Sequence, residues 1–173
     1  AATNFIWDGY GTDTIDASAL SEEATIHLSP GHHDFVGTSA NALITAAGQV
    51  TVNFSTEIEN LIGSAFSDKL YGNELNNVIT GGLGGDTIDG GSGIDQAVYT
   101  ENFTDVSLVK SETVWNITSG ADKDTLSNIE RLKFNDKHIA LDLDGNAGKT
   151  VKLLGLLLGK DQATNKTYVG AGI

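Results

Sequence analysis

Side chains that can donate oxygen ligands recur at nine-residue intervals in the middle of this 173-residue chain. Divided into nines from Gly63, residues 63–98 read GSAFSDKLY, GNELNNVIT, GGLGGDTID and GGSGIDQAV. The sixth position of each nine carries a carboxylate or an amide: Asp68, Asn77, Asp86 and Asp95. Oxygens of this kind suit a hard cation such as Ca²⁺, which takes about six to eight of them. The spacing therefore predicts repeated cation binding.

The glycines and apolar residues of the repeat predict how the chain brings these oxygens together. Six glycine-rich residues can form a tight turn, because glycine tolerates positive φ, and three more with one inward apolar residue form a short strand. The eighth position is apolar throughout: Leu70, Ile79, Ile88 and Ala97. Each nine is then half a coil, so that successive strands build two facing parallel sheets and repeats two apart stack. A flexible acidic linker, the alternative interpretation, predicts no such register.

A fifth copy stands apart at residues 8–16, which read DGYGTDTID. It is followed by a non-repeat insertion at 17–53 and by IENLIG at 58–63. In this order of parts the chain resembles the RTX repeat family, and residues 4–98 are similar to the calcium-binding C-terminal domain of serralysin-type secreted metalloproteases. Domains of this kind also occur in large bacterial adhesins, lipases and epimerases exported by type I secretion.

The resemblance implies about three calcium ions, each held between two stacked repeats. In the family, carbonyls at positions two and four of one repeat and one and three of the next but one join both position-six side chains. The first implied site comprises Ser64, Phe66, Asp68, Gly81, Leu83 and Asp86. The second comprises Asn73, Leu75, Asn77, Gly90, Ser92 and Asp95. The third comprises Gly9, Gly11, Asp13, the Glu57 carbonyl and the Glu59 carboxylate.

Departures from the family pattern affect these implied sites unequally. Phe66, Leu75 and Leu83 replace or precede expected glycines, but each would supply only a carbonyl, so the expected cost is backbone strain. Asn77 in place of Asp removes one charge, and the second site is therefore expected to be the weakest. Asp8 would face a preceding turn that this chain lacks, which leaves a further weak site incomplete.

A second weak calcium candidate lies after the repeats, where alternate side chains can share one cation: Asp142, Asp144 and Asn146. Leu153 stands where a calcium loop of the EF-hand type would place its bidentate glutamate. The alternative is a turn followed by a helix from about Ala147, because the apolar residues of 151–158 have helical spacing.

The whole chain predicts an all-β fold with one short C-terminal helix. Strands are expected at 24–29 and 49–54 within the insertion, and antiparallel strands at 97–99, 106–109, 113–117 and 132–134. Residues 124–132, DTLSNIERL, resemble the closing segment that often follows RTX repeats and covers the open edge of the last coil. We therefore expect a parallel β-roll with its β-rich insertion at 1–98, an antiparallel β cap at 99–141 and a short helical extension at 142–173. The chain starts without Met and ends without a stop signal, so we expect a piece of a longer protein.

Charge and composition exclude several kinds of function. Residues 1–109 hold 15 of the 23 acids and one base, Lys69, and the net charge of the chain is −13. Without a basic face, binding to nucleic acid or to an anionic membrane surface is not expected. The longest apolar stretch, 151–158, is too short to span a bilayer. Cysteine is absent, which excludes disulfides and thiolate chemistry.

No catalytic constellation is recognisable, so the chain is expected not to be an enzyme. The four histidines form no His-Glu-x-x-His motif, and the zinc site of the resembled proteases is therefore absent. Ser92 lies in Gly-Ser-Gly, which lacks the Gly-x-Ser-x-Gly spacing. His32 and His33 beside Asp34 form either a transition-metal site or, more simply, a solvent-facing pair.

The residues and the resemblance together predict a calcium-binding module that folds when it meets calcium. By resemblance it belongs to a larger bacterial protein, passes unfolded through the type I secretion machinery and folds outside the cell or at the cell surface, as a monomer. Two alternatives remain open. One is the accessory C-terminal domain of a serralysin-like zinc metalloprotease whose catalytic domain is not in this chain. The other is an adhesin or ligand-binding region of an RTX protein.

Overall fold

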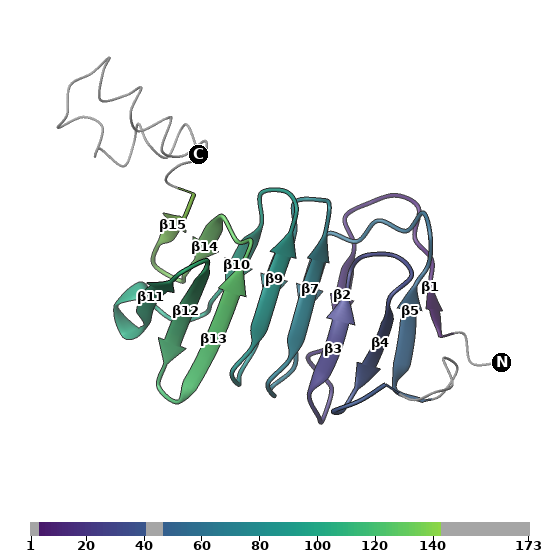
Figure 1. The fold of residues 1–173 in the computed structure, drawn as a ribbon, viewed down its shortest axis with the longest axis horizontal. Helices are drawn as coiled ribbons and strands as arrows, with labels where there is room; N and C mark the ends of the chain where they lie inside the picture. Colours follow the sequence, from purple (N-terminus) through teal and green to yellow (C-terminus); the bar gives the residue numbers. More distant parts are fainter. Residues whose placement is uncertain (1–3, 41–46, 143–173) are drawn as a thin grey trace, which may run out of the picture.

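The computed structural model describes residues 4–40 and 47–142 and shows an all-β molecule with two facing sheets (Figure 1). Its described strands are β1 (Phe5–Ile6), β2 (Thr14–Asp16), β3 (Ala24–His27), β4 (His33–Val36), β5 (Gln49–Val52), β6 (Asn60–Ile62), β7 (Lys69–Asn73), β8 (Val78–Thr80), β9 (Thr87–Gly91), β10 (Gln96–Val98), β11 (Ser107–Ser111), β12 (Val114–Ser119), β13 (Asp122–Ser127), β14 (Arg131–Lys133) and β15 (His138–Ala140). A short 3-10 helix, η1 (Phe103–Asp105), precedes β11. Within this part of the chain, no helix has the length and apolarity needed to cross a membrane.

Parallel pairing dominates the middle of both sheets. The nine-stranded sheet has the order β1-β5-β4-β3-β7-β9-β13-β12-β11, and the six-stranded sheet has the order β15-β14-β10-β8-β6-β2. All neighbours are parallel along β3-β7-β9-β13 and along β2-β6-β8-β10-β14. Consecutive nonapeptides therefore alternate between the sheets, and strands one coil apart lie side by side, as Figure 1 shows for β7 and β9.

The apolar position of each repeat forms the core between the sheets. Its members are at most 1% exposed: Leu70, Ile88 and Leu126 in the nine-stranded sheet, and Leu61, Ile79, Ala97 and Leu132 in the six-stranded sheet. Successive side chains of a strand face opposite ways, so one inward residue per half-coil fills the interior while its neighbours face outward. At the cap end, Phe134 closes this core; its ring lies 5.3 Å from those of Tyr99 and Phe103.

Antiparallel pairing occurs toward the ends of the molecule. The insertion places β4 between β3 and β5 with antiparallel pairing on both sides. The cap adds β11 and β12 to β13, and β15 to β14, in the same way. The expected antiparallel strand at 97–99 is wrong, because β10 pairs in parallel with both β8 and β14. The strand expected at 132–134 is antiparallel to β15 but parallel to β10. β10 and β14 both continue the coil, in which neighbouring strands run in the same direction.

Other expectations for secondary structure have mixed outcomes. The strands expected at 24–29 and 49–54 are confirmed as β3 and β5, each shorter than expected. Those at 106–109 and 113–117 are confirmed as antiparallel partners β11 and β12. The expected C-terminal helix lies outside the described residues, as do Asp144 and Asn146.

Candidate metal centre

The turns between strands stack so closely that carbonyls of one turn lie against glycines of the next. A Cβ atom on Gly82 would lie 1.9 Å from the Ser64 carbonyl oxygen, and one on Gly84 would lie 2.8 Å from that of Phe66. Both glycines have positive φ, +106° and +105°, a conformation that side chains rarely adopt. The Ser64 and Phe66 carbonyls of the first implied site therefore lie against the next turn, where a side chain at position 82 or 84 would clash with them.

The second pair of turns repeats this arrangement. Cβ atoms on Gly91 and Gly93 would lie 2.3 Å and 2.6 Å from the carbonyl oxygens of Asn73 and Leu75. In the opposite direction, the Gly90 carbonyl oxygen lies 2.1 Å from a Cβ position on Gly72. The structure thus brings carbonyls of both turns of the second implied site into one narrow space.

Position-six side chains form a ladder of hydrogen bonds beside the nine-stranded sheet. Asp68 accepts the Ala24 N–H at 2.7 Å, Asp86 accepts the Asp68 N–H at 2.9 Å, and Asp124 accepts the Asp86 N–H at 2.9 Å. Each carboxylate therefore binds the amide of the residue one coil before it. The ladder begins at Ala24, which has no carboxylate, and ends at Asp124 in the cap.

A second ladder lies beside the six-stranded sheet. Glu59 accepts the Asp13 N–H at 2.9 Å, Asp95 accepts the Asn77 N–H at 2.7 Å, and Glu130 accepts the Asp95 N–H at 2.8 Å. The implied partners Asp13 and Glu59 are thus adjacent, as are Asn77 and Asp95. Glu130, like Asp124, was not among the expected site residues.

Buried carboxylate oxygens without partners mark both ladders. Oδ2 of Asp86 and Oδ2 of Asp95 accept no hydrogen bond, although the two residues are only 1% and 0% exposed. Burial above all, together with the charge of a nearby carboxylate, Asp124 for Asp86 and Glu130 for Asp95, raises the pKa of each carboxyl to about 7. A buried, unpaired carboxylate is costly, and a bound cation removes that cost. The donor set therefore fits Ca²⁺.

The implied third site shows the same feature in a more open setting. Oδ2 of Asp8 and Oδ2 of Asp13 are buried without partners. Contact with the Asp8 side chain raises the pKa of Asp13, and burial and the charges of Asp8 and Glu59 add to this. Gly11 lies against this carboxylate, since its Cβ position is 3.0 Å from Asp13 Oδ2. Gly9 and Glu57 are both exposed. The carbonyl of Asp13 accepts a hydrogen bond from Asn60 Nδ2 at 3.1 Å, and those of Ile58 and Glu59 accept hydrogen bonds from Asn77 Nδ2.

Asn77 and Asp68 differ from the other position-six residues because hydrogen bonds occupy both of their terminal atoms. Asn77 Nδ2 donates to the carbonyls of Ile58 at 3.3 Å and Glu59 at 3.2 Å, and its Oδ1 accepts the Asn73 N–H at 2.8 Å. Asp68 Oδ2 accepts the Ser64 N–H at 2.5 Å, and Oδ1 accepts the Ser64 hydroxyl at 3.0 Å. At Asn77 the amide donors satisfy main-chain carbonyls directly, and the expectation that the second site is the weakest stays a prediction.

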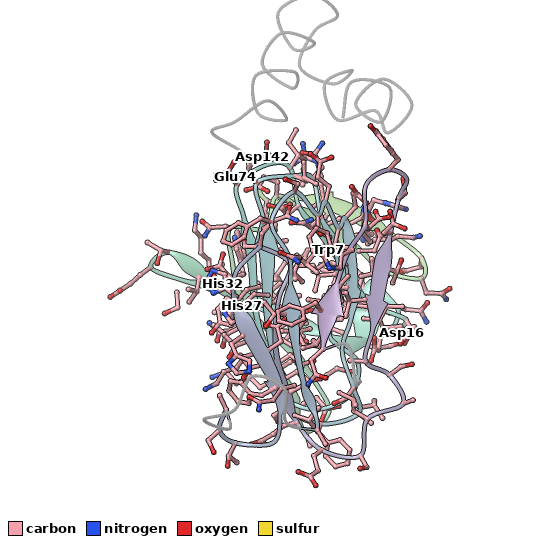
Figure 2. All side chains as sticks on the ribbon, turned by 90° about the vertical axis from the view of Figure 1, so that its right-hand side faces the viewer. Trp7, Asp16, His27, His32, Glu74 and Asp142 are labelled. Atoms are coloured by element: carbon pink, nitrogen blue, oxygen red, sulfur yellow. The ribbon has the colours of Figure 1, made fainter. Side chains whose placement is uncertain are left out.

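Two other candidates have structural roles in the described residues. Asp142 forms an ion pair with Arg131, whose guanidinium also donates to the Glu130 carbonyl at 2.8 Å. Of the candidate group His32, His33 and Asp34, Asp34 Oδ1 lies 2.9 Å from His27 Nδ1. The His27 ring stacks on that of Tyr71 and on that of His32, which lies beside it in Figure 2. In the ranges 4–40 and 47–142, no group of three or more His, Cys, Asp or Glu side chains is arranged to hold a metal ion. A cation between the turns would therefore depend on main-chain carbonyls together with paired side chains.

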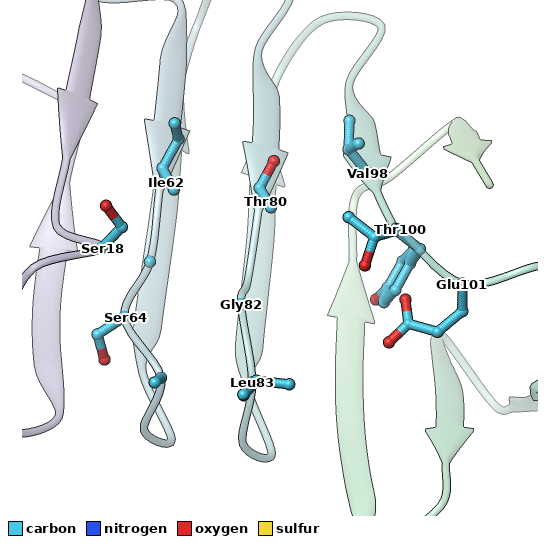
Figure 3. Close-up of a pocket in the computed structure, with 12 residues that line it drawn as sticks. Ser18, Ile62, Ser64, Thr80, Gly82, Leu83, Val98, Thr100 and Glu101 are labelled. Atoms are coloured by element: carbon cyan, nitrogen blue, oxygen red, sulfur yellow. The ribbon is translucent and has the colours of Figure 1, made fainter. Parts of the chain in front are cut away.

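A shallow hollow on the outer side of the six-stranded sheet offers little chemistry. Its volume is about 270 Å³, and its lining includes Ile62, Thr80 and Val98 from β6, β8 and β10 (Figure 3). Glu101 and Tyr99 are its titratable residues, and burial raises the pKa of the Tyr99 phenol far above its usual range. Ser18 and Ser64 also line the hollow, and its lining residues include no histidine, lysine or arginine that could activate a hydroxyl.

Asp124 and Glu130 are the members of the two ladders that sequence reasoning missed. The signal was present, since DTL at 124–126 repeats the DTI of 86–88, and IERL at 129–132 repeats the IENL of 58–61. The nine-residue spacing does not reveal this similarity, because a hairpin precedes Asp124 and a short turn precedes Glu130, where a nonapeptide would stand in the repeats.

The fold and the stacked turns define a glycine-rich, acidic repeat domain whose loops carry paired oxygen donors. A family model described as the peptidase M10 serralysin C terminal matches residues 3–162. The chain therefore belongs to the serralysin C-terminal family. Metallopeptidase AprA of Pseudomonas marginalis and metalloprotease AprA of Pseudomonas entomophila (strain L48) are each 34% identical to it over 74 residues. Those residues are 43% of this chain and 14% of the relatives, so the match covers a small part of their length.

Proposed function

We propose that this chain is a calcium-dependent folding module in which three ions bind between stacked turns. The observation that carries the proposal is the buried, unpartnered Oδ2 of Asp86 and of Asp95, each in a turn whose neighbour presents main-chain carbonyls. Family membership supports it, because serralysin-type C-terminal domains are generally calcium-binding. The parallel strands would form the two walls of a β-roll spanning residues 1–98, closed by a cap at 99–141.

Calcium can decide whether such a module is folded. Sites of extracellular type have a Kd of about 10⁻⁴ to 10⁻³ M, and an ion at ten times its Kd stabilises the folded state by about 1.4 kcal/mol. Three sites then contribute about 4 kcal/mol, a large share of the ~5–15 kcal/mol that separates folded from unfolded domains. Repulsion among the unpaired carboxylates lowers the stability of the metal-free form further.

The module would act as a non-catalytic part of a larger secreted protein. A chain that stays unfolded where calcium is scarce suits passage through a type I secretion channel, and binding of calcium outside the cell would complete its folding. The two AprA relatives favour a metalloprotease as the parent, with this chain as its accessory C-terminal domain. An upstream sequence containing His-Glu-x-x-His would support that parent, and an upstream sequence without it would contradict it.

Titration calorimetry tests the calcium proposal directly. The chain should bind at least three Ca²⁺ ions per molecule, with far weaker binding of Mg²⁺, because the smaller ion demands octahedral geometry and keeps its water. Absence of calcium binding up to about 10 mM, ten times the Kd of weak extracellular sites, would overturn the proposal.

A further inference from the structure

Tyr99 directly follows β10 of the six-stranded sheet, but its hydroxyl reaches a carboxylate of the other sheet. The hydroxyl donates to Asp124 Oδ2 at 3.0 Å, and Asp124 belongs to β13 of the nine-stranded sheet. The main chain of Tyr99 stays with its own sheet, because its N–H donates to the carbonyl of Lys133 in β14 at 2.8 Å. One side chain thus joins the two sheets at the cap end of the core.

Both ends of this connection are held by their surroundings. Asp124 is only 6% exposed, and the Tyr99 ring lies 5.3 Å from that of Phe134, with 21° between the two planes. Burial raises the pKa of the Asp124 carboxyl, while hydrogen bonds from the Asp86 N–H and the Tyr99 hydroxyl favour its charged form. Loss of either donor would leave a buried oxygen without a partner, which is costly. The Tyr99 hydroxyl therefore holds the Asp124 carboxylate in place.

Asp124 in turn holds the main chain of the first proposed calcium site. Its Oδ1 accepts the Asp86 N–H at 2.9 Å, and Asp86 Oδ2 is the unpartnered oxygen of that site. Tyr99 also lines a hollow together with Ser64 and Leu83, which belong to the two turns of the same site (Figure 3). The contacts of Tyr99 therefore extend from the cap to the turns that would hold the ion.

We infer that Tyr99 is a positioning residue through which docking of the cap strengthens calcium binding at the first site. The inference rests on the proposed function and adds a regulation of that site. With the cap docked, Asp124 fixes the Asp86 main chain and places a second negative charge beside it, so the ion meets a prepared site. Coupling is reciprocal, so calcium at this site also favours the docked cap. The second site lies outside this connection, because Glu130 and not Asp124 accepts the Asp95 N–H.

Calorimetry of Tyr99→Phe, which keeps the ring and removes the hydroxyl, tests the inference. One of the three proposed sites should bind calcium about fivefold more weakly, the lower end of ordinary coupling between sites, and the other two should be unchanged. Tyr10→Phe removes a hydroxyl from a side chain that is 98% exposed and should bind calcium as the wild type does. In an Asp124→Ala background, Tyr99→Phe should have no further effect on calcium binding, because the two residues act as one connection.

Fluorescence of Trp115 measures the coupling from the side of the cap. Trp115 lies in β12 and packs against the core, and Trp7→Phe leaves it as the only tryptophan of the chain. In this background, the calcium concentration at the midpoint of the Trp115 signal should rise about fivefold with Tyr99→Phe. It should not change with Tyr10→Phe.

The outcomes separate this inference from the proposed function. Unchanged calcium binding in Tyr99→Phe would overturn the inference and leave the sites between turns intact. Equal weakening of all three sites would also overturn it, because the hydroxyl would then act only on general stability, and so would an equal effect of Tyr10→Phe. Tyr99→Phe decides the inference whether or not Asp124→Ala folds. Absence of calcium binding by the wild type would contradict the proposed function itself.

Discussion

Replacing Gly82 by alanine should disrupt the first proposed calcium site through the main chain alone. The new Cβ would lie 1.9 Å from the Ser64 carbonyl oxygen, whereas ordinary contacts begin near 3.4 Å. The two turns must therefore separate by about 1.5 Å at this point. A left-handed alanine costs about 1–2 kcal/mol and the overpacking about 1–3 kcal/mol, so we expect a destabilisation of about 3 kcal/mol in saturating calcium.

The same displacement should remove one calcium ligand. Calcium–oxygen distances are about 2.3–2.6 Å, so a carbonyl moved by about 1.5 Å no longer coordinates. We expect the Kd of one site to rise at least tenfold, measured by calorimetry, alongside urea unfolding at fixed calcium.

Two other glycines separate the possible causes. Gly120→Ala has positive φ, +60°, with nothing within 4 Å of the new atom, so it should show only the backbone cost, about 1 kcal/mol. Gly9→Ala has neither positive φ nor a neighbour within 4 Å and should be near neutral. If Gly82→Ala lost no more stability than Gly120→Ala and kept its calcium affinity, the close stacking of the turns would be refuted.

Three further predictions concern the carboxylates and the core. In chelator, the folded pKa of about 7 for Asp86 and Asp95 lies above the usual aspartate value of 3.8, so their contribution to stability is present below about pH 4 and lost as pH rises through 7. Circular dichroism should therefore show more β structure in the metal-free chain at pH 5 than at pH 8, and equal signals at the two pH values would contradict this. Asp86→Asn should increase the β signal of the chain in chelator at pH 8, because it removes an unpaired buried charge, yet weaken calcium binding about tenfold, the loss expected for about 1.4 kcal/mol; a fall in both quantities would argue against an uncompensated charge. Leu70→Ala, at a position 0% exposed between β3 and β9, should cost about 2–5 kcal/mol in urea unfolding, and a loss below 1 kcal/mol would show that the core is not continuous there.

Much of the repeat region could be predicted from sequence because its chemistry is periodic. Apolar residues such as Leu70 and Ile88 recur at a fixed spacing, and one inward residue per half-coil determines the register of both sheets. The position-six residues follow from the same spacing, and for this reason the implied partners Asp68 and Asp86 lie one coil apart with a direct hydrogen bond between them.

The insertion and the cap were less predictable because tertiary contacts determine them. β4 begins His33-Asp34, a polar start that single-sequence patterns do not assign to a strand, and antiparallel neighbours on both sides hold it in the sheet. In the cap, Asp124 and Glu130 continue the two ladders although the chain reaches them without nonapeptides. Their place follows from register with β9 and β10. The sequences DTL and IERL resemble the earlier DTI and IENL, but their irregular spacing hides this register.

The most direct test of the account is far-UV circular dichroism of the metal-free and calcium-bound chain. We predict that the chain in excess chelator at pH 8 lacks most of its β signal and its cooperative melt, and that about 10 mM calcium, ten times the Kd of weak extracellular sites, restores both. Magnesium at the same concentration should not substitute. An identical β signal and melting temperature in chelator and in calcium would contradict the claim that calcium decides the folded state.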